Sequence, residues 1–397
     1  MKHLTIATVS ALALLVASPV LAAEWNTATT KQDGAGNVLD LTQTGTNGSA
    51  DIKQTGDGNG TGPDNNAKSE QSGTNNKLAI EQAGNLNGFV TTQTGGDNNA
   101  IEIKQTNNNN FAIVDQNGGG SSTTKIGQTG ATFGLGATTS QQDAFNSTID
   151  IGQEGVSYQV AGAFQTGTSD GANILIRQFG DLNGAIALQT NVAGSSISLG
   201  QDGKTNVATA TQENQSNYST VLVGQFGEGS TVNVFQNASS GSTVSVGQSG
   251  GSNARIEQLR ANGSTAQLIQ IASSNTANLY QTDTLGSDVT VNQYSVGNTA
   301  TVRQTESNYA TVDVLQYGGA GNTATVNQTG SFGAGIYLIQ NGTTNDAGLT
   351  QVGANASTIT AGQDGTSNSI TAYQAGALNT INSTQVGTSN IARISQR

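Results

Sequence analysis

Glutamine recurs along this chain at nearly constant steps, and this spacing limits the possible folds more than any other feature. From Gln32 to Gln396 there are 32 marker glutamines, nearly all 11 or 12 residues apart, with a few steps of 10 or 13 and one of 17. A fixed period is the signature of a repeat architecture, in which each unit packs on its neighbours. Disordered Asn/Gln-rich segments have no reason to keep such a period. We therefore predict one long repeat domain.

The residues between markers alternate with a period of two. Around one marker, Val289, Val291 and Gln293 alternate with Thr290 and Asn292. Strict alternation of this kind is typical of a β-strand with one buried face. Glycine and asparagine gather between the alternating segments, as expected for turns that need positive φ. Each unit is therefore predicted to be strand, turn and strand, about 23 residues long, and the markers correspond to about 16 units.

A unit of this size cannot bury a face alone, but stacked units can. We predict an all-β fold, a two-sided β-solenoid of about 16 strand–turn–strand rungs of about 23 residues, with amyloid-like cross-β stacking. At a rung spacing of about 4.8 Å this makes a rod of about 75–80 Å. Stacking in register places Gln over Gln and Asn over Asn, so that each side-chain amide donates to one neighbouring rung and accepts from the other. The ladder residues expected on this basis are Gln178, Asn183, Gln189, Gln201, Asn206, Gln212, Gln248, Gln293, Asn298, Gln304, Gln363, Asn368, Gln374, Gln385 and Gln396.

The composition agrees with amide ladders and excludes other classes of protein. Apolar residues make up 34% of the chain, against roughly 45–50% in a globular domain, while Asn and Gln together number 78. A conventional core of large apolar side chains is thereby excluded, and we expect Ser, Ala, Val and Ile to fill a thin interior. A net charge of −12 excludes a nucleic-acid partner bound through basic charge.

The first residues predict export. Lys2 and His3 precede an apolar stretch from Leu4 to Val16, and Val20-Leu21-Ala22 resembles a cleavage site. This is the pattern of a secretory signal peptide, and the apolar stretch is shorter than the roughly 20 residues of a membrane span. We predict a signal peptide at 1–22, a short N-terminal segment at 23–36 and the solenoid at 37–397, without membrane insertion. The chain has no Cys, so disulfides do not stabilise it.

Two segments depart from the pattern. The step of 17 residues between Gln54 and Gln71 contains Pro63, which cannot donate to a sheet ladder, so we expect an enlarged turn there. The stretch from Ala131 to Gln142 is the least regular and is a candidate weak point. The chain contains no linker, which favours a single domain.

The repeat resembles that of the curlins, the secreted subunits of bacterial curli amyloid fibres. The residues that carry the resemblance are Ser195, Gln201, Gly203, Asn206, Ala208 and Gln212, with the same spacing at Gln178, Gly180, Asn183, Ala185 and Gln189. It extends from about Asn26 to Arg397. Familiar curlins have about a third as many repeat units, and the stretch from Glu24 to Gly36 is short for the family's pore-targeting leader. The last seven residues, with their basic end, resemble the minor nucleating subunit.

The resemblance implies an extracellular structural subunit of curli-like fibres, which serve cell adhesion and the biofilm matrix. Its partners would be further copies of itself, a nucleating curlin and an outer-membrane secretion pore, reached through the periplasm. The ends of the repeat favour polymerisation independently, because no capping segment follows the marker Gln396 and an open strand edge recruits other chains. Head-to-tail stacking that does not close produces filaments.

Enzymatic and metal-binding functions are disfavoured, and we expect no cofactor. Removing the signal peptide removes the only His and Met, which leaves no imidazole ligand and no His-based nucleophile. Asp150 and Glu154 are the candidate carboxylate pair, by proximity alone. Asp57-Gly58-Asn59 and Asp97-Asn98-Asn99 are similar to calcium loops but lack the distant Glu of an EF-hand.

Three other functions stay open. The chain could be the minor nucleating subunit of such fibres, a soluble monomeric adhesin rod or an ice-binding rod. Ice binding would use threonine columns, for which Thr299, Thr301, Thr323 and Thr325 are candidates. Aromatic residues just after markers could contact sugars or neighbouring fibrils, or pack at the edge of the rod; they are Phe179, Phe226, Tyr294 and Tyr317.

Overall fold

The computed structural model describes residues 25–60, 66–130 and 134–397, and over these ranges the chain contains strands and turns without a helix. The predicted signal peptide at 1–22 and the enlarged turn at Pro63 lie outside the described residues. So does the first part of the irregular stretch, residues 131–133. The chain divides between Lys204 and Thr205 into two compact units, which are described one at a time.

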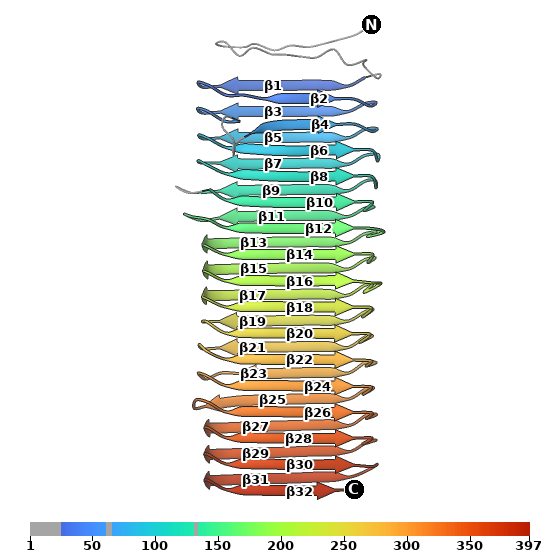
Figure 1. Ribbon diagram of the computed structural model, residues 1–397, viewed down its shortest axis with the longest axis vertical. Coiled ribbons are helices and arrows are strands. Elements are labelled where there is room, and N and C mark those ends of the chain that lie inside the picture. Colours follow the sequence, from blue (N-terminus) through green and yellow to red (C-terminus); the bar gives the residue numbers. More distant parts are fainter. Residues whose placement is uncertain (1–24, 61–65, 131–133) are drawn as a thin grey trace. The chain divides into compact units, whose positions relative to one another are not determined.

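The first unit contains fifteen described strands, which run in sequence order in Figure 1. They are β1 (Thr27–Asp33), β2 (Asp40–Gln43), β3 (Ser49–Thr55), β4 (Ala67–Gln71), β5 (Lys77–Ala83), β6 (Gly88–Thr94), β7 (Ala100–Thr106), β8 (Phe111–Asn117), β9 (Thr123–Thr129), β10 (Gly136–Gln142), β11 (Thr148–Glu154), β12 (Val160–Thr166), β13 (Asn173–Asp181), β14 (Gly184–Thr190) and β15 (Ser196–Lys204). The strand β1 lies inside the segment 23–36, so strand pairing begins before residue 37.

The second unit contains seventeen described strands of the same kind. They are β16 (Val207–Glu213), β17 (Thr220–Glu228), β18 (Thr231–Asn237), β19 (Thr243–Ser249), β20 (Asn253–Leu259), β21 (Thr265–Ile271), β22 (Thr276–Thr282), β23 (Asp288–Gln293), β24 (Thr299–Thr305), β25 (Thr311–Gly318), β26 (Thr323–Thr329), β27 (Gly335–Thr343), β28 (Asp346–Val352), β29 (Thr358–Thr366), β30 (Ser369–Ala375), β31 (Thr380–Thr388) and β32 (Ile391–Gln396).

Within each unit, odd-numbered strands form one parallel sheet and even-numbered strands form the other. Every described strand contains one marker glutamine, and each marker lies opposite the marker of the next strand in its sheet, as Gln270 lies opposite Gln293. Two consecutive strands make one rung, so the predicted all-β, two-sided β-solenoid of about 16 turns is confirmed.

The interior is thin and built as the alternation predicts. In β23 the side chains of Val289, Val291 and Gln293 are buried, while Asp288 is exposed and Thr290 is half-buried. Buried positions elsewhere hold Ala, Val, Ile, Leu, Ser and Thr, together with the marker glutamines. Since each rung supplies few apolar atoms, the hydrogen bonds of the buried amides have a large share in holding the stack together.

The turns need left-handed backbone at recurrent places, which explains their glycine content. Gly180 and Gly365 have φ of 93° and 119°, and a Cβ at either would lie within 2.2 Å of a backbone oxygen in the next rung. Only glycine fits such a site without displacing a neighbour.

The described part of the irregular stretch is regular in structure. β10 pairs in register with β8 and β12, and its Ala137, Thr139 and Gln141 are buried. The departure from the repeat lies in the turn before β10, where Leu135 occupies a buried position.

Candidate assembly interface

The marker glutamines form hydrogen-bonded ladders along both sheets. The Nε2 of Gln270 donates to the Oε1 of Gln293 at 2.8 Å, and the Nε2 of Gln293 donates to the Oε1 of Gln316 at 2.7 Å. Each Nε2 commonly has a second acceptor on the facing strand, as Gln293 donates to the carbonyl of Thr276 at 3.3 Å. The ladders therefore join successive rungs and also join the two sheets across the interior.

The glutamine ladders have a direction. In the glutamine pairs of both units the amide nitrogen of the earlier rung donates to the amide oxygen of the later rung, from the Gln32–Gln54 pair to the Gln374–Gln396 pair. Among the described residues, the Oε1 of Gln32 and of Gln43 therefore receives no donor. At the other end, the Nε2 of Gln396 has no acceptor within that same part of the chain. One edge thus presents amide acceptors and the other presents an amide donor.

The asparagines follow a different scheme from the one predicted. Most of the buried asparagines lie in the turns from an odd to an even strand, here called the odd-to-even arcs. The Oδ1 of Asn298 accepts the backbone N–H of Asn322 at 3.0 Å, and its Nδ2 donates to the carbonyl of Ser295 at 2.7 Å. The prediction that Asn amides bond to each other from rung to rung is wrong for these arcs, apart from the bond of Asn390 to Asn368. The shorter Asn side chain reaches the main chain of the turn instead.

Serines take the corresponding place in most of the even-to-odd arcs, the turns from an even to an odd strand, while Asn76 and Asn99 do so before β5 and β7. The N–H of Ser264 donates to the Oγ of Ser242 at 3.2 Å, and the N–H of Ser287 donates to the Oγ of Ser264 at 3.2 Å. A hydroxyl therefore satisfies the main chain here as the Asn oxygen does in the other arcs. Sequence reasoning included Ser only as a repeat residue, without this role.

The odd-to-even column of the first unit is interrupted for two rungs. Asn110 is followed in the next arcs by Leu135 and Gln159, all buried. The Oδ1 of Asn110 and the Oε1 of Gln159 are buried without a hydrogen-bond partner among the described residues. Leucine has no side-chain amide to continue the column, and the extra methylene of Gln places its oxygen differently from that of Asn. A buried polar atom without a partner costs about 1–3 kcal/mol.

The structure places the fifteen predicted ladder residues as follows. Fourteen are buried, and Gln396 is half-buried because the described residues cover β32 on one side only. In the first unit Gln178 bonds to Gln201, Gln189 donates to the carbonyl of Ser195, and Asn183 donates to the carbonyl of Gly203. In the second unit the Gln and Asn side chains bond within their columns, and they are Asn206, Gln212, Gln248, Gln293, Asn298, Gln304, Gln363, Asn368, Gln374, Gln385 and Gln396.

The outward carboxylates include Asp150 and Glu154, the candidate pair of the sequence analysis. Asp150 forms an ion pair with Arg177 at 2.6 Å, one rung away, so the structure joins it to this arginine and shows no contact between it and Glu154. Burial raises the pKa of Asp115 on β8 and of Asp313 on β25 above the usual range. Neither lies within a group of three His, Cys, Asp or Glu residues that could hold a metal, and the described ranges contain no such group.

The two loops similar to calcium sites serve as turns. The Oδ1 of Asp57 accepts the N–H of Ala35 at 2.8 Å, and the Nδ2 of Asn59 donates to the carbonyl of Gly84 at 2.9 Å. Asn99 accepts the N–H of Ser122 at 3.0 Å. These polar atoms thus form hydrogen bonds between neighbouring rungs.

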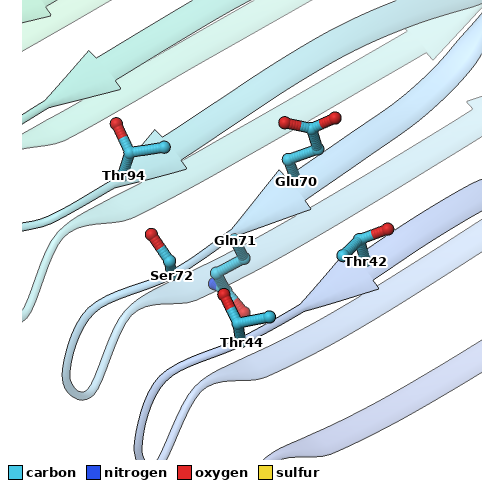
Figure 2. A pocket seen from close by; sticks show the side chains of 6 residues that line it. All are labelled: Thr42, Thr44, Glu70, Gln71, Ser72 and Thr94. Atoms are coloured by element: carbon cyan, nitrogen blue, oxygen red, sulfur yellow. The ribbon is translucent and has the colours of Figure 1, made fainter. Parts of the chain in front are cut away.

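A small recess of about 120 Å³ lies at the ends of β2, β4 and β6 (Figure 2). Thr44, Ser72 and Thr94 follow one another along it, while Gln71 points away from Glu70. Glu70 pairs with Lys68 at 2.7 Å, and this contact raises the pKa of the lysine. Glu70 is the one carboxylate among the residues that line this recess, so the lining does not supply the two carboxyl groups that a general acid and a general base would need.

The candidate threonine columns are short. Thr299 lies opposite Thr323 and Thr301 opposite Thr325, but the next strand in the sheet has Asp346 and Gly348 at these positions. The aromatic residues that follow markers are exposed, and all belong to the sheet of odd-numbered strands, called the first sheet. They are Phe179, Phe226, Tyr294 and Tyr317.

Comparison with protein-family models and with curated proteins finds no match to this chain. The resemblance to the curlins therefore rests on the repeat residues themselves. No helix suited to crossing a membrane occurs among the residues that the structure describes.

Proposed function

We propose that this chain is a secreted structural subunit that assembles head to tail into curli-like extracellular fibres. The observation that carries the proposal is the uniform contact between rungs. β1 on β3 and β30 on β32 pair in the same parallel register, with marker opposite marker. A surface that repeats in this way does not distinguish a rung of the same chain from a rung of a second copy.

The direction of the glutamine ladders supports the same proposal. The unused acceptors of Gln32 and Gln43 at one edge of the described residues complement the unused donor of Gln396 at the other. A second copy that stacks its first rung on β31 and β32 continues both ladders without inverting them. Such heterologous contact does not close and produces a filament.

The rest of the proposal follows from the sequence. The signal-like start and the absence of cysteine favour export through the periplasm to the cell surface. The resemblance to the curlins adds a nucleating curlin and an outer-membrane pore as partners, and adhesion and biofilm formation as roles. The nucleating subunit itself is the second candidate within the same family.

The test is fibre formation by the purified chain without its first 22 residues. After dilution from denaturant, we expect a lag followed by thioflavin-positive, cross-β fibrils that seed fresh protein. A chain that stays monomeric in sedimentation at tens of micromolar for days would contradict the proposal and favour a soluble adhesin or ice-binding rod. The nucleating role would be favoured if this chain accelerated the assembly of a second curlin more than it accelerated its own assembly.

A matched pair of variants on β23 makes the test specific. Gln293→Lys places a charge in the buried ladder, whereas Thr290→Lys places it on the outer face of the same strand. A buried unpaired charge is strongly unfavourable. We expect Gln293→Lys to slow assembly at least tenfold and Thr290→Lys to leave the rate within about twofold. Equal rates would show that the ladder does not drive assembly.

A further inference from the structure

A second recess lies on the outer face of the first sheet in the first unit, over β9, β11 and β13. It has a volume of about 290 Å³. Gly127, Gly152 and Arg177 share one outward column, in which each residue lies opposite the next. Because Gly127 and Gly152 have no side chain, the Arg177 side chain has room to lie over Gly152 and forms part of the floor. We call this recess the Arg177 groove.

Arg177 is held firmly along the floor. Its Nη2 donates to the Oδ2 of Asp150 at 2.6 Å, and its Nη1 donates to the Oδ1 at 3.1 Å. The Nη1 also donates to the carbonyls of Asp150 and Ile176 at 3.2 and 3.0 Å. A bidentate pair fixes the plane of the guanidinium. A Cβ on Gly152 would lie 3.0 Å from the Cδ of Arg177, so the glycine makes room for this arrangement.

The neighbouring column supplies an aromatic ring and further polar groups. Thr129, Glu154 and Phe179 lie opposite one another in register. Phe179 is 44% exposed, and the exposed carboxylate of Glu154 has no partner among the described residues. The groove thus combines an exposed ring, a fixed guanidinium and a carboxylate that can accept hydrogen bonds.

We propose that the Arg177 groove binds a strand of neutral polysaccharide. Ligand sites for uncharged polar molecules combine an apolar or aromatic surface with a few fixed polar groups. A pyranose ring has an apolar face for Phe179 and hydroxyls for Glu154, Asp150 and Arg177. Rungs follow each other at about 4.8 Å, a spacing similar to the length of one sugar ring in an extended chain.

Charge favours a neutral ligand over an anionic one. Two carboxylates face one guanidinium in the groove, and the whole chain carries −12. Long-range repulsion therefore disfavours acidic polymers. This inference is independent of fibre formation, since the groove lies within the first unit and is complete in one copy.

The experiment measures binding of cellohexaose, a neutral hexasaccharide, to the full chain by calorimetry, with oligogalacturonate as the acidic comparison. We expect a Kd below about 1 mM for cellohexaose and none measurable for oligogalacturonate. Phe179→Ala and Glu154→Gln should each weaken binding at least fivefold. Gly152→Ala should do the same by displacing Arg177, although it removes no contact with the ligand.

The second unit offers matched controls. Phe226 is 57% exposed at the corresponding position of β17, and a Cβ on Gly247 of β19 would meet nothing within 4 Å. Phe226→Ala and Gly247→Ala should leave binding unchanged. Circular dichroism of each variant checks that the β-structure is kept.

Four outcomes would overturn the proposal. The first is absence of cellohexaose binding by the parent chain at about 10 mM ligand. The second is a loss of binding on Phe226→Ala equal to that on Phe179→Ala. The third is a preference for the acidic probe. If the groove variants change only the association between copies of the chain, the groove is a protein contact and the proposal fails as well.

Discussion

Five of the seven described ion pairs lie on the outer faces of the first unit, whereas the described aromatic contacts lie on those of the second, which also has the Arg260–Asp283 pair. In the first unit Lys53 and Lys104 both approach Glu81, at 3.4 and 3.7 Å. All eight lysines of the sequence precede residue 205, and seven of its eight tyrosines follow it. In the second unit Tyr309 and Phe332 form an edge-to-face pair with centroids 5.5 Å apart. The two outer surfaces differ although the strands of both units bury the same alternate positions.

The odd-to-even arcs show a second difference, and it lies in the interior. The second unit bonds its arcs from rung to rung through Asn and Ser, while the first is interrupted at Leu135 and Gln159. The outer faces can vary because they contribute little to the stack. An interruption in the arcs leaves polar groups buried without partners. The comparison predicts that arc substitutions matter more than surface ones, as the following experiments test.

The largest effect is expected when the interruption is copied into the second unit. Asn298→Leu removes the acceptor of the Asn322 N–H and the donor to the Ser295 carbonyl. At about 1–3 kcal/mol for each of the two groups, the loss should be about 2–6 kcal/mol. Urea unfolding, with hydrogen exchange to locate the effect, measures it.

The control is an outward Asn on the preceding strand. The Oδ1 of Asn292 is buried without a partner within the described part of the chain. Asn292→Leu should therefore be neutral or stabilising. An equal loss of stability in both variants would contradict the role of the arcs.

A smaller gain is expected from repairing the interruption in the first unit. Gln159→Asn should let the side-chain oxygen accept a backbone N–H of the next rung, which adds about 1 kcal/mol. Slower hydrogen exchange around residues 154–160 would report it. The reverse change in the same column, Asn183→Gln, should speed exchange locally. If neither variant alters exchange, the interruption has no energetic consequence.

Removing a surface ion pair should matter less and should depend on salt. Glu81→Gln deprives Lys53 and Lys104 of their partner, and these side chains are 43–62% exposed. The loss should be below about 1 kcal/mol at low salt and should vanish near 1 M salt. Phe332→Leu in the second unit weakens an aromatic pair instead, so its effect should persist in salt. A salt-independent loss on Glu81→Gln would refute the electrostatic explanation.

The smallest effects concern two carboxylates, one in each unit. Burial raises the pKa of Asp115 and of Asp313, so the folded state holds these protons to higher pH than the unfolded state does. Their stabilising contribution is present below the unfolded pKa and is lost as pH rises through the raised pKa. Asp115→Asn and Asp313→Asn should therefore stabilise the chain at pH 7, within the roughly 0.5 kcal/mol of surface positions, and not at pH 3.

Asp283 has a pKa shifted in the opposite direction, so its substitution should change stability with the opposite dependence on pH. Its hydrogen bond with Arg260 lowers the pKa of the carboxyl. Stability from this group is present above the unfolded pKa and is lost as pH falls through the lowered one. Asp283→Asn should be slightly destabilising at pH 7 and neutral in strong acid. Urea unfolding of each variant between pH 3 and pH 7 measures these changes in stability. A stabilising effect of Asp283→Asn at pH 7, or a destabilising effect of Asp115→Asn or Asp313→Asn, would contradict the explanation.

The sequence by itself determined the strands, their inward faces and their stacking. The marker spacing located one glutamine in every described strand, and the alternation identified the buried residues of β23 and β24. This is possible because a period of two leaves one inward face. Stacking repeats in register then brings like residues together. The glutamine ladders follow from these two facts alone.

Only the tertiary structure decided how the amides of the turns bond and what the outer faces bring together. Asn298 bonds to the main chain because its short side chain reaches the backbone of the arc, which spacing does not reveal. Asp150 and Arg177 are 27 residues apart and meet through the conformations of their side chains across one rung. The repeat period is a property of the backbone. Contacts between outward side chains depend on their lengths and rotamers, and these are chosen only when the rungs are in place.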